Sequence, residues 1–471
     1  MVMTSLLTCS TELYEHQRRA VKKLERIKVG ALYMEMGTGK TRTALELIAR
    51  RYNAGKVDHV LWLCPCSVKE TIRREIQKHI TGDTSMFTIC GIETLSSSIR
   101  ANVDCLRLVQ SKNVYLIVDE SNLVKNPKAK RTQNIQRLAD HCRYKLILNG
   151  TPVSRNEADM FAQWKILDWR ILGYRSFWSF SRNHVVWDEK VRGRIKDIVN
   201  VDYLTRRIAP YTYQVRKDEC LDLPDKTYSS RYFELTYEQK ELYSYVAEKL
   251  LFELDELQPH TIYRLFAGLQ GVTSGFFVGV EKKNIEMEPF FKEPRNNPRI
   301  ETLLYLLDQT DEKVIIFCKY TQEINDIVKI LNEDYGEGSA VPFYGELNTR
   351  SRQRNLDRFA SDAKFLVANK TTAGYGLNLQ FCNTVVFYNN DWDYATRSQA
   401  EDRVHRIGQN RKVHIIDICA SNTLDERILK CLYRKENMVD SFKAYIDHYK
   451  NDKKSLEAWI HGKSLHKQKR S

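Results

Sequence analysis

The stretch Met36-Gly37-Thr38-Gly39-Lys40-Thr41 has the residue types and spacing of a phosphate-binding loop. Its two glycines lack a Cβ, so backbone N–H groups can approach phosphate oxygens closely. Lys40 can reach the β- and γ-phosphates of a nucleotide, and Thr41 can ligate Mg²⁺. The first glycine of the general pattern is absent, because position 34 is Met34. The loop predicts nucleotide binding, and the alternative is an ordinary strand-to-helix turn.

A pair of carboxylates follows a second apolar run. Residues 114–118 are apolar and lead directly into Asp119 and Glu120. In an open parallel sheet the carboxyl ends of the strands hold the ligand. Asp119 is therefore a candidate Mg²⁺ ligand, and Glu120 is a candidate to orient and deprotonate the attacking water. The alternative is a strand end that faces solvent.

Three further side chains are candidates for the same site. Gln17, in a helix upstream of the loop, can present its amide to adenine, although a surface glutamine is the simpler interpretation. Arg403 and Arg406 are three residues apart and are predicted to share one face of a helix. Arginines can supply charge to the γ-phosphate from a second domain, and the alternative is a pair of surface salt bridges.

The order of apolar runs predicts the elements that position these residues. Runs near 29–33, 59–64, 87–90, 114–118 and 146–149 alternate with helical patterns, which predicts an α/β fold with a parallel sheet covered on both faces. A second series has runs at 313–318, 364–368, 384–388 and 413–417. Between the two series, Pro294 to Pro298 form a Pro/Asn/Arg-rich segment that is the candidate hinge.

The chain is accordingly divided into five segments. Residues 1–155 form the first lobe, and 156–235 form a helical insertion together with a strand that returns to this lobe. The aromatic residues of the insertion are expected in its core, and stacking on bases is the alternative. Residues 236–298 form a second helical insertion and the hinge, 299–437 form the second lobe, and 438–471 form a basic tail that is either solvated or in contact with nucleic acid.

Composition constrains the partners and the compartment. The 471 residues have a formal net charge of +14, which argues for nucleic acid as a partner, or else for a basic surface that is simply solvated. The 11 cysteines form no C-x-x-C pair, which favours reduced thiols over disulfides or zinc and predicts an intracellular location. We expect no signal peptide, because Met1 to Thr11 has no basic region ahead of an apolar core. We expect no membrane contact, because no apolar run approaches the length of a membrane span.

These segments together resemble the Swi/Snf-like family of superfamily-two helicases, from Leu13 to about Leu429. The resemblance is carried by the following motifs: Leu13 to Gln17; Glu35 to Thr41; Leu148-x-Gly150-Thr151-Pro152; Leu223-Pro224-x-Lys226 with Leu235-Thr236-x-x-Gln239-x-x-Leu242-Tyr243; Gly374-x-Gly376-x-Asn378-Leu379; and Gln399 to Gln409. There are two departures. The usual Asp-Glu-Ala-His is Asp119-Glu120-Ser121-Asn122, and Asn149 stands where threonine is usual.

The resemblance implies two RecA-like lobes with ATP and Mg²⁺ bound between them. It implies that residues 36–41, Asp119 and Glu120 act from the first lobe, and Gly376, Arg403 and Arg406 from the second. It also assigns contacts with the tracked DNA strand to a set of residues spread over both lobes, namely Pro65, Cys66, Thr151, Cys318 and Thr372. A compact monomeric motor of this type is expected in a bacterial or virus-infected cytoplasm, or in a nucleus if the source is eukaryotic.

The predicted function is a DNA-stimulated ATPase that translocates on double-stranded DNA and displaces or remodels bound proteins. One alternative is a helicase that separates strands of DNA or RNA, so single-stranded DNA and RNA remain alternative partners. The other is a nucleotide-switched clamp that binds DNA with little turnover, an interpretation that the departures at Asn122 and Asn149 leave open.

Overall fold

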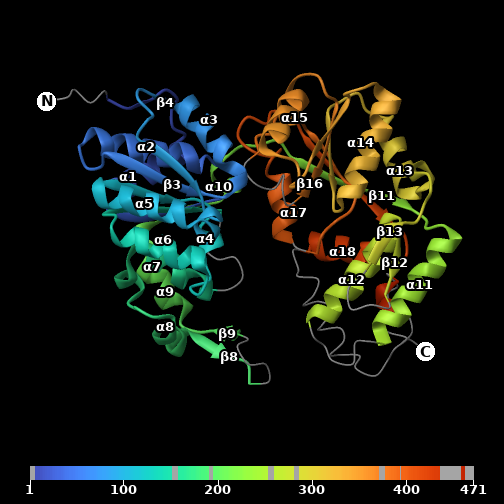
Figure 1. Ribbon diagram of the computed structural model, residues 1–471, viewed down its shortest axis with the longest axis horizontal. Coiled ribbons are helices and arrows are strands. Elements are labelled where there is room, and N and C mark those ends of the chain that lie inside the picture. The colour runs from blue at the N-terminus through green and yellow to red at the C-terminus, as the bar shows by residue number, and fades with distance from the viewer. Residues whose placement is uncertain are drawn as a thin grey trace. The chain divides into compact units, whose positions relative to one another are not determined.

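The computed structural model describes residues 6–150, 157–189, 195–252, 259–280, 286–370, 377–392, 394–434 and 458–461. The chain divides into two compact units, with the boundary between Asp222 and Leu223. Each unit contains one six-stranded sheet flanked by helices (Figure 1). The predicted α/β fold with two parallel-sheet lobes is confirmed.

The first unit is built on a parallel sheet with the strand order β10-β2-β7-β6-β3-β5. Its strands are β2 (Val29–Met34), β3 (His59–Cys64), β5 (Phe87–Gly91), β6 (Val114–Val118), β7 (Tyr144–Asn149) and β10 (Thr212–Val215). The helices between them are α1 (Glu15–Leu24), α2 (Lys40–Asn53), α3 (Lys69–His79), α4 (Thr94–Ser97), α5 (Ile99–Ser111) and α6 (Lys130–Asp140). A short antiparallel pair, β1 (Thr8–Cys9) and β4 (Ile80–Thr81), lies outside the sheet.

Both faces of this sheet are buried, which explains why its strands read as nearly continuous apolar runs. Every residue of β3 and of β6 is buried. Successive side chains of a strand point to opposite faces. Ala31 and Tyr33 accordingly pack in one core cluster, and Leu32 and Met34 pack in another.

The insertion that follows β7 is not purely helical. It contains α7 (Met160–Leu172), α8 (Phe177–His184) and α9 (Val201–Ile208), and also the antiparallel hairpin β8 (Val185–Trp187) with β9 (Ile195–Ile198). The sequence did not predict the hairpin, because its strands are short and half-exposed. Trp164 is fully buried, as expected for a core aromatic, but Trp178 and Trp187 are 66% and 42% exposed.

The second unit is built on a parallel sheet with the strand order β11-β18-β17-β14-β16-β15. Its strands are β11 (Lys226–Phe233), β14 (Val314–Cys318), β15 (Ala340–Phe343), β16 (Phe365–Asn369), β17 (Thr384–Phe387) and β18 (Val413–Ala420). Its helices are α11 (Tyr237–Phe252), α12 (Pro259–Ser274), α13 (Pro298–Leu307), α14 (Thr321–Tyr335), α15 (Thr349–Ser361), α17 (Tyr394–Glu401) and α18 (Leu424–Tyr433).

Strand β11 corrects the predicted segment boundaries. The sequence assigned the strand that ends segment 156–235 to the first lobe, but β11 pairs with β18 over its full length, from Lys226 opposite Val413 to Phe233 opposite Ala420. The strand that returns to the first sheet is β10, beside β2. Alternation along one strand predicts the strand itself but does not identify its partner, and that is why the assignment was wrong.

The predicted hinge also proves to be a packed segment. Residues 294–298 lie inside the second unit and lead from β13 (Glu286–Pro289), which pairs with β12 (Phe276–Gly279), into the first residue of helix α13. Asn297 is buried, its Oδ1 accepts the Arg299 N–H at the start of α13, and its Nδ2 donates to Ser274 O. The Pro- and Asn-rich composition therefore marks a helix cap, and the boundary between the units lies earlier, after Asp222.

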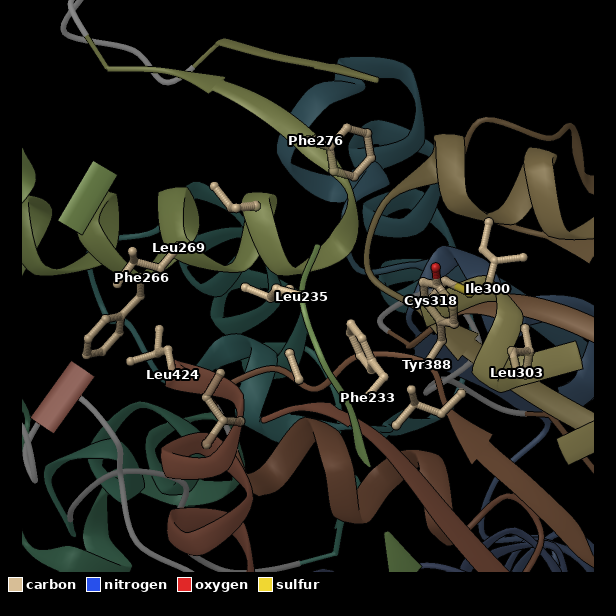
Figure 2. Close-up of a cluster of buried hydrophobic side chains, with 14 of the residues drawn as sticks. Phe233, Leu235, Phe266, Leu269, Phe276, Ile300, Leu303, Cys318, Tyr388 and Leu424 are labelled. Carbon is tan, nitrogen blue, oxygen red and sulfur yellow. The ribbon is translucent and has the colours of Figure 1, made fainter. Parts of the chain in front are cut away.

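A large hydrophobic core joins the insertion helices of the second unit to its sheet. Figure 2 shows Phe266 and Leu269 of α12 gathered with Phe233 and Leu235 and with Tyr388. The short described segment near the C-terminus joins this core, because Trp459 and Ile460 are buried and the Trp459 ring stacks on Phe266 at 6.3 Å. Part of the predicted basic tail thus packs against the unit.

Three general features concern helix length, cysteines and possible metal ligands. Within the described residues, no helix combines the length and the apolar character needed to cross a membrane. All 11 cysteines are free thiols, and most are buried. The same residues include no group of three or more His, Cys, Asp or Glu side chains arranged to hold a metal ion.

Candidate functional site: a nucleotide-binding edge and an arginine turn

The phosphate-binding loop joins β2 to α2 through two glycines in the left-handed region. Gly37 and Gly39 have φ values of 82° and 88°, and α2 begins at Lys40 with Gly39 as its N-cap. Side chains with a Cβ rarely adopt this conformation, so glycine is required at both positions. Thr38 fixes the shape of the loop, since its N–H and its hydroxyl both donate to Glu35 O, at 3.2 and 2.7 Å.

Lys40 and Thr41 occupy the first turn of α2. The Lys40 ammonium donates to Met34 O at 2.9 Å, so the side chain folds back over the loop. Thr41 is half-buried beside it. The start of α2 therefore combines a cation, the positive end of a helix dipole and a hydroxyl, which suits the phosphates of a nucleotide.

Two neighbouring residues of α1 hold the loop from one side. His16 Nε2 lies 2.8 Å from Thr38 O, and the Gln17 amide nitrogen donates to the same carbonyl at 3.2 Å. Gln17 Oε1 accepts the Tyr14 N–H at 3.0 Å. Gln17 is buried, so it positions the loop, and its predicted contact with adenine stays a prediction. Sequence reasoning missed His16, whose burial lowers its pKa below the ordinary value.

Glu35 holds the loop from the other side. Its N–H donates to Val215 O in β10 at 3.1 Å, and its carboxylate accepts the Lys217 N–H at 2.7 Å. The family motif included Glu35, but the sequence did not identify its partner, because that partner lies 182 positions further along the chain. The loop is therefore fixed both to α1 and to the edge strand of the sheet.

The acidic pair lies at the same edge of the sheet as the loop. All strands of this sheet are parallel and only β7 separates β2 from β6, so both strands deliver their carboxyl ends to one edge. Asp119 is 8% exposed, its N–H donates to Leu63 O at 2.8 Å, and its Oδ1 accepts the Glu120 N–H at 3.0 Å. The predicted proximity of Lys40, Asp119 and Glu120 is therefore present within the first unit.

The electrostatics of this edge favour a cation. Burial and the neighbouring Glu120 carboxylate raise the pKa of Asp119 to about 7, and the Lys40 ammonium only partly opposes them. A divalent cation would offset the charge of two crowded carboxylates. Together with the Thr41 hydroxyl, the donor set is composed of oxygen, which is what Mg²⁺ prefers.

The two departures from the family pattern border this edge. Asn149 ends β7, and its Oδ1 accepts the Gly150 N–H at 2.9 Å. Within the described part of the chain, Asn149 Nδ2 and Asn122 Oδ1 are buried without a hydrogen-bond partner. The structure thus contains an unused amide donor and an unused amide acceptor on neighbouring segments.

The predicted DNA contacts differ in exposure. Cys66 is exposed, its N–H donates to Glu93 Oε2 at 2.9 Å, and Pro65 beside it is buried. Cys318 is fully buried in the core of the second unit, and its assignment as a DNA contact stays a prediction. Thr151 and Thr372, like the predicted nucleotide contact Gly376, lie outside the described residues.

Arg403 and Arg406 lie together in the second unit, but not on a helix. Helix α17 ends at Glu401, and residues 402–409, which we call the arginine turn, form successive tight turns. Arg403 O accepts the Leu379 N–H at 3.1 Å, and the Arg406 guanidinium donates to Asn378 Oδ1 at 2.5 Å. A three-residue spacing predicted a helix face, but these tertiary contacts hold the segment in a different conformation.

Comparison with known protein families matches three parts of the chain. The SNF2-related domain matches residues 87–272, and the helicase conserved C-terminal domain matches residues 298–408. The type III restriction enzyme res subunit domain matches residues 10–154. The two helicase domains fall in the order that the resemblance predicted.

Individual relatives agree with these matches. YwqA of Bacillus subtilis, which is named a putative ATP-dependent helicase/translocase, is 27% identical over 69% of this chain and 35% of its own length. The TATA-binding protein-associated factor mot1 of Aspergillus fumigatus is 26% identical over 67% of this chain and 19% of its own length. The chain thus spans about a third or less of the length of these relatives.

A solved structure is similar along nearly the whole chain. The SWI2/SNF2 ATPase core of Sulfolobus solfataricus, in complex with dsDNA, is 22% identical, covers 99% of this chain and 100% of its own, and has a TM-score of 0.42. The family assignment depends on the matched domains and on the motifs that the geometry brings together. The chain belongs to the SNF2-related family of superfamily-two helicases, which are ATP-hydrolysing enzymes that use a nucleotide.

Proposed function

We propose that this chain is a DNA-stimulated ATPase that translocates on double-stranded DNA and displaces or remodels proteins bound to it. The observation that carries the proposal is the meeting of Lys40, Asp119 and Glu120 at one edge of the first sheet. A phosphate-binding lysine beside an acidic pair is the arrangement needed to cleave the γ-phosphate of a nucleotide.

Each side chain has a proposed part in the reaction. Backbone N–H groups of residues 36–41 bind the phosphates, Lys40 neutralises the γ-phosphate, and Gln17 and Gly376 contact the nucleotide. Thr41 and Asp119 would hold Mg²⁺, which supplies positive charge to the phosphate oxygens when it is bound. Glu120 orients the attacking water and accepts its proton.

Arg403 and Arg406 are proposed to act on the same nucleotide from the second unit. Guanidinium groups stabilise charge on the transferring phosphate without undergoing a proton transfer themselves. Their location in a segment held by tertiary contacts supports a defined presentation of both side chains.

DNA is the proposed polymer because the chain carries a net charge of +14 and has relatives named as a translocase and as a TATA-binding protein-associated factor. A motor that moves along any sequence needs contacts with the phosphate backbone rather than with base edges. The proposed positions of such contacts are Pro65, Cys66, Thr151, Cys318 and Thr372, and a monomer is the proposed unit of function.

The test is ATP turnover of the purified chain with duplex DNA, single-stranded DNA or RNA. We expect duplex DNA to give the largest stimulation, and Lys40→Ala and Glu120→Gln to lose at least about 100-fold in kcat. Lys56→Ala is the matched control, because Lys56 is exposed and follows the other end of the helix that begins at Lys40. Stimulation by RNA alone would favour a strand-separating helicase, and absence of turnover with every polymer would favour a clamp.

Translocation itself requires a second assay. A third strand bound in the major groove of a duplex is displaced by a motor that travels along the duplex, and no separation of the two duplex strands is needed. We expect ATP-dependent displacement of such a strand by the wild-type chain and none by Glu120→Gln. Turnover without displacement would contradict the translocase assignment while leaving the ATPase assignment in place.

A further inference from the structure

Hydrogen bonds hold the arginine turn to the rest of the second unit near both of its ends. Its backbone makes no regular helix after Glu401, and Gln409 Nε2 donates to Cys382 O at 2.9 Å near its end. At its start, the N–H groups of Val404 and His405 both donate to Glu401 O, at 3.1 and 2.9 Å. The position of Glu401 therefore determines where the arginine turn begins.

The Glu401 carboxylate is held by three donors. Lys226 Nζ and the Tyr228 hydroxyl donate to Oε2 at 2.8 and 2.9 Å, and Arg397 Nε donates to Oε1 at 2.8 Å. Burial acts to raise the pKa of Glu401, but the charges of Arg397 and Lys226 outweigh it and lower the pKa below the ordinary value, so the carboxylate is ionised. The Glu401 side chain is only 8% exposed, so loss of a partner would leave a buried charge less compensated.

Residues on both sides of Lys226 also contact the arginine turn or the strand that follows it. His405 Nε2 lies 2.8 Å from Pro224 O, and because a carbonyl only accepts, the ring must donate through this nitrogen. Asp225 O accepts the N–H of Val413, the first residue of β18, at 3.1 Å. Residues 224–228, which open strand β11 (Figure 1), are thus bonded to the segments before, within and after the turn.

Helix α17 has an anchor that does not involve Lys226. The Arg397 guanidinium donates to both carboxylate oxygens of Asp417 in β18, at 2.5 and 3.1 Å, and both side chains are buried. Removal of Lys226 should therefore leave the helix in place and release mainly its C-terminal end, where Glu401 and the arginine turn lie.

We propose that Lys226 is a positioning residue whose ion pair with Glu401 holds the arginine turn against β11 and so determines where Arg403 and Arg406 present their guanidinium groups. The inference rests on the proposed function, in which both arginines act on the nucleotide. Lys226 lies only a few residues beyond Asp222, where the first unit ends.

The test compares Lys226→Met, which keeps the length of the side chain but removes the charge, with Lys226→Arg, which keeps the charge. We expect Lys226→Met to lower kcat about tenfold at saturating ATP and DNA, while KM for ATP changes less than about threefold. Lys226→Arg should recover most of the loss. Lys240→Met is the matched control, since Lys240 pairs with Glu234 at 3.0 Å on the exposed surface of the same unit.

A second measurement reports on the arginine turn directly. Hydrogen exchange of peptides that cover residues 402–409 should be faster in Lys226→Met than in the wild type and in Lys240→Met, while peptides from β18 keep wild-type exchange. Tyr228→Phe removes one donor but keeps the ion pair, so it should shift both measurements in the same direction by less.

Several outcomes would overturn the inference. They are a kcat for Lys226→Met within twofold of the wild type, unchanged exchange over 402–409, and an equal loss in Lys240→Met. A lower melting temperature with proportionally lower kcat in both lysine variants would likewise assign Lys226 to general stability. If the wild-type chain itself shows no turnover, the proposed function fails, and the exchange comparison alone decides whether Lys226 holds the turn.

Discussion

Glu120 has a backbone conformation that acidic residues rarely adopt. Its φ and ψ are 48° and 55°, in the left-handed region. Within the described residues, the other non-glycine residues with positive φ are Asn200 and Asn422, and asparagine tolerates this region far better than glutamate. Strain of this kind persists where the surrounding structure imposes it, often at functional sites. Here it accompanies the carboxylate that we propose as the catalytic base.

Replacement of Glu120 by glycine should therefore separate stability from activity. We expect Glu120→Gly to raise the free energy of unfolding by about 0.5–1 kcal/mol, because relief of the left-handed strain exceeds the added backbone entropy of glycine in the unfolded chain. Turnover should fall at least about 100-fold because the base is absent. Urea denaturation and ATP turnover measure the two effects.

Glu120→Gln is the control for charge. It removes the repulsion between Glu120 and Asp119 but keeps the strained backbone, so Glu120→Gly should be the more stable of the two variants. A glycine variant no more stable than the glutamine variant would show that the backbone at this position stores no strain.

The strand ends of the first unit also contain a titratable contact on the side away from the nucleotide. His59 opens β3, its Nε2 lies 2.9 Å from Thr88 Oγ1, and Lys112 Nζ lies 3.3 Å from its Nδ1. An ammonium group only donates, so Nδ1 must accept and Nε2 must carry the hydrogen. Burial, and then the Lys112 charge, lower the pKa of His59 below its ordinary value.

This contact predicts a loss of stability in mild acid. A histidine whose pKa is lower in the folded state contributes stability that is fully present above its unfolded pKa, about 6.5, and is lost as the pH falls below that value. We expect the melting temperature of the wild type to fall between pH 7.5 and pH 5.5 more steeply than that of Lys112→Met. Lys56→Met, which removes a neighbouring lysine, should keep the wild-type slope, and parallel slopes for all three proteins would contradict the assignment.

At the scale of elements, local patterns predicted what a segment forms better than what it contacts. The strands β3 and β6 could be predicted from their apolar runs, because both faces of a parallel sheet are covered. The phosphate-binding loop could be predicted from its glycines, because few other residues fit there. The partner of β11 could not be predicted, because it is β18, which lies far away in the sequence. The packing of residues 294–298 could not be predicted either, because it depends on Ser274. The prediction of a helix at the arginine turn was wrong for the same reason, because contacts with other segments determine its conformation.

In the candidate site too, local patterns predicted some residues, whereas contacts between distant residues were missed. Lys40, Thr41, Asp119 and Glu120 were predicted from residue type and spacing, and the geometry brings them to one edge. His16 and Lys226 were not predicted as parts of the site, since a histidine or a lysine is common at a surface and only the contacts with Thr38 O and Glu401 distinguish them. The burial of Cys318, in contrast, agrees with its place in an apolar run.

At the scale of the whole molecule, the chemistry is divided between two units that each have a complete sheet and core. The first unit holds every phosphate-binding and acidic residue of the proposed site, and the second holds both arginines. Neither unit alone carries all the charged side chains that the proposed reaction uses. The proposed function therefore depends on one nucleotide being used by both units.

If both units act on one nucleotide, substitutions in the two units should cause different defects. Arg406→Ala should bind a fluorescent ATP analogue with an affinity within about threefold of the wild type, because the phosphate loop is intact, but should lose at least about 100-fold in kcat. Lys40→Ala should lose turnover as well. The double variant should be no slower than the worse single variant, since residues that act on one transition state are not additive. Nucleotide titration and steady-state turnover measure both quantities.

Arg411→Ala is the matched control for this experiment. Arg411 follows the arginine turn, and its guanidinium pairs with Glu312 at 2.6 Å on the exposed surface, so its removal deletes a cation of the same unit without touching Arg403 or Arg406. We expect wild-type turnover from this variant, because exposed ion pairs contribute little to stability. Turnover by Arg406→Ala at the rate of Arg411→Ala would mean that the first unit hydrolyses ATP without the second. The proposal that both units act on one nucleotide would then be wrong, whereas the assignment of the phosphate-binding edge would still hold.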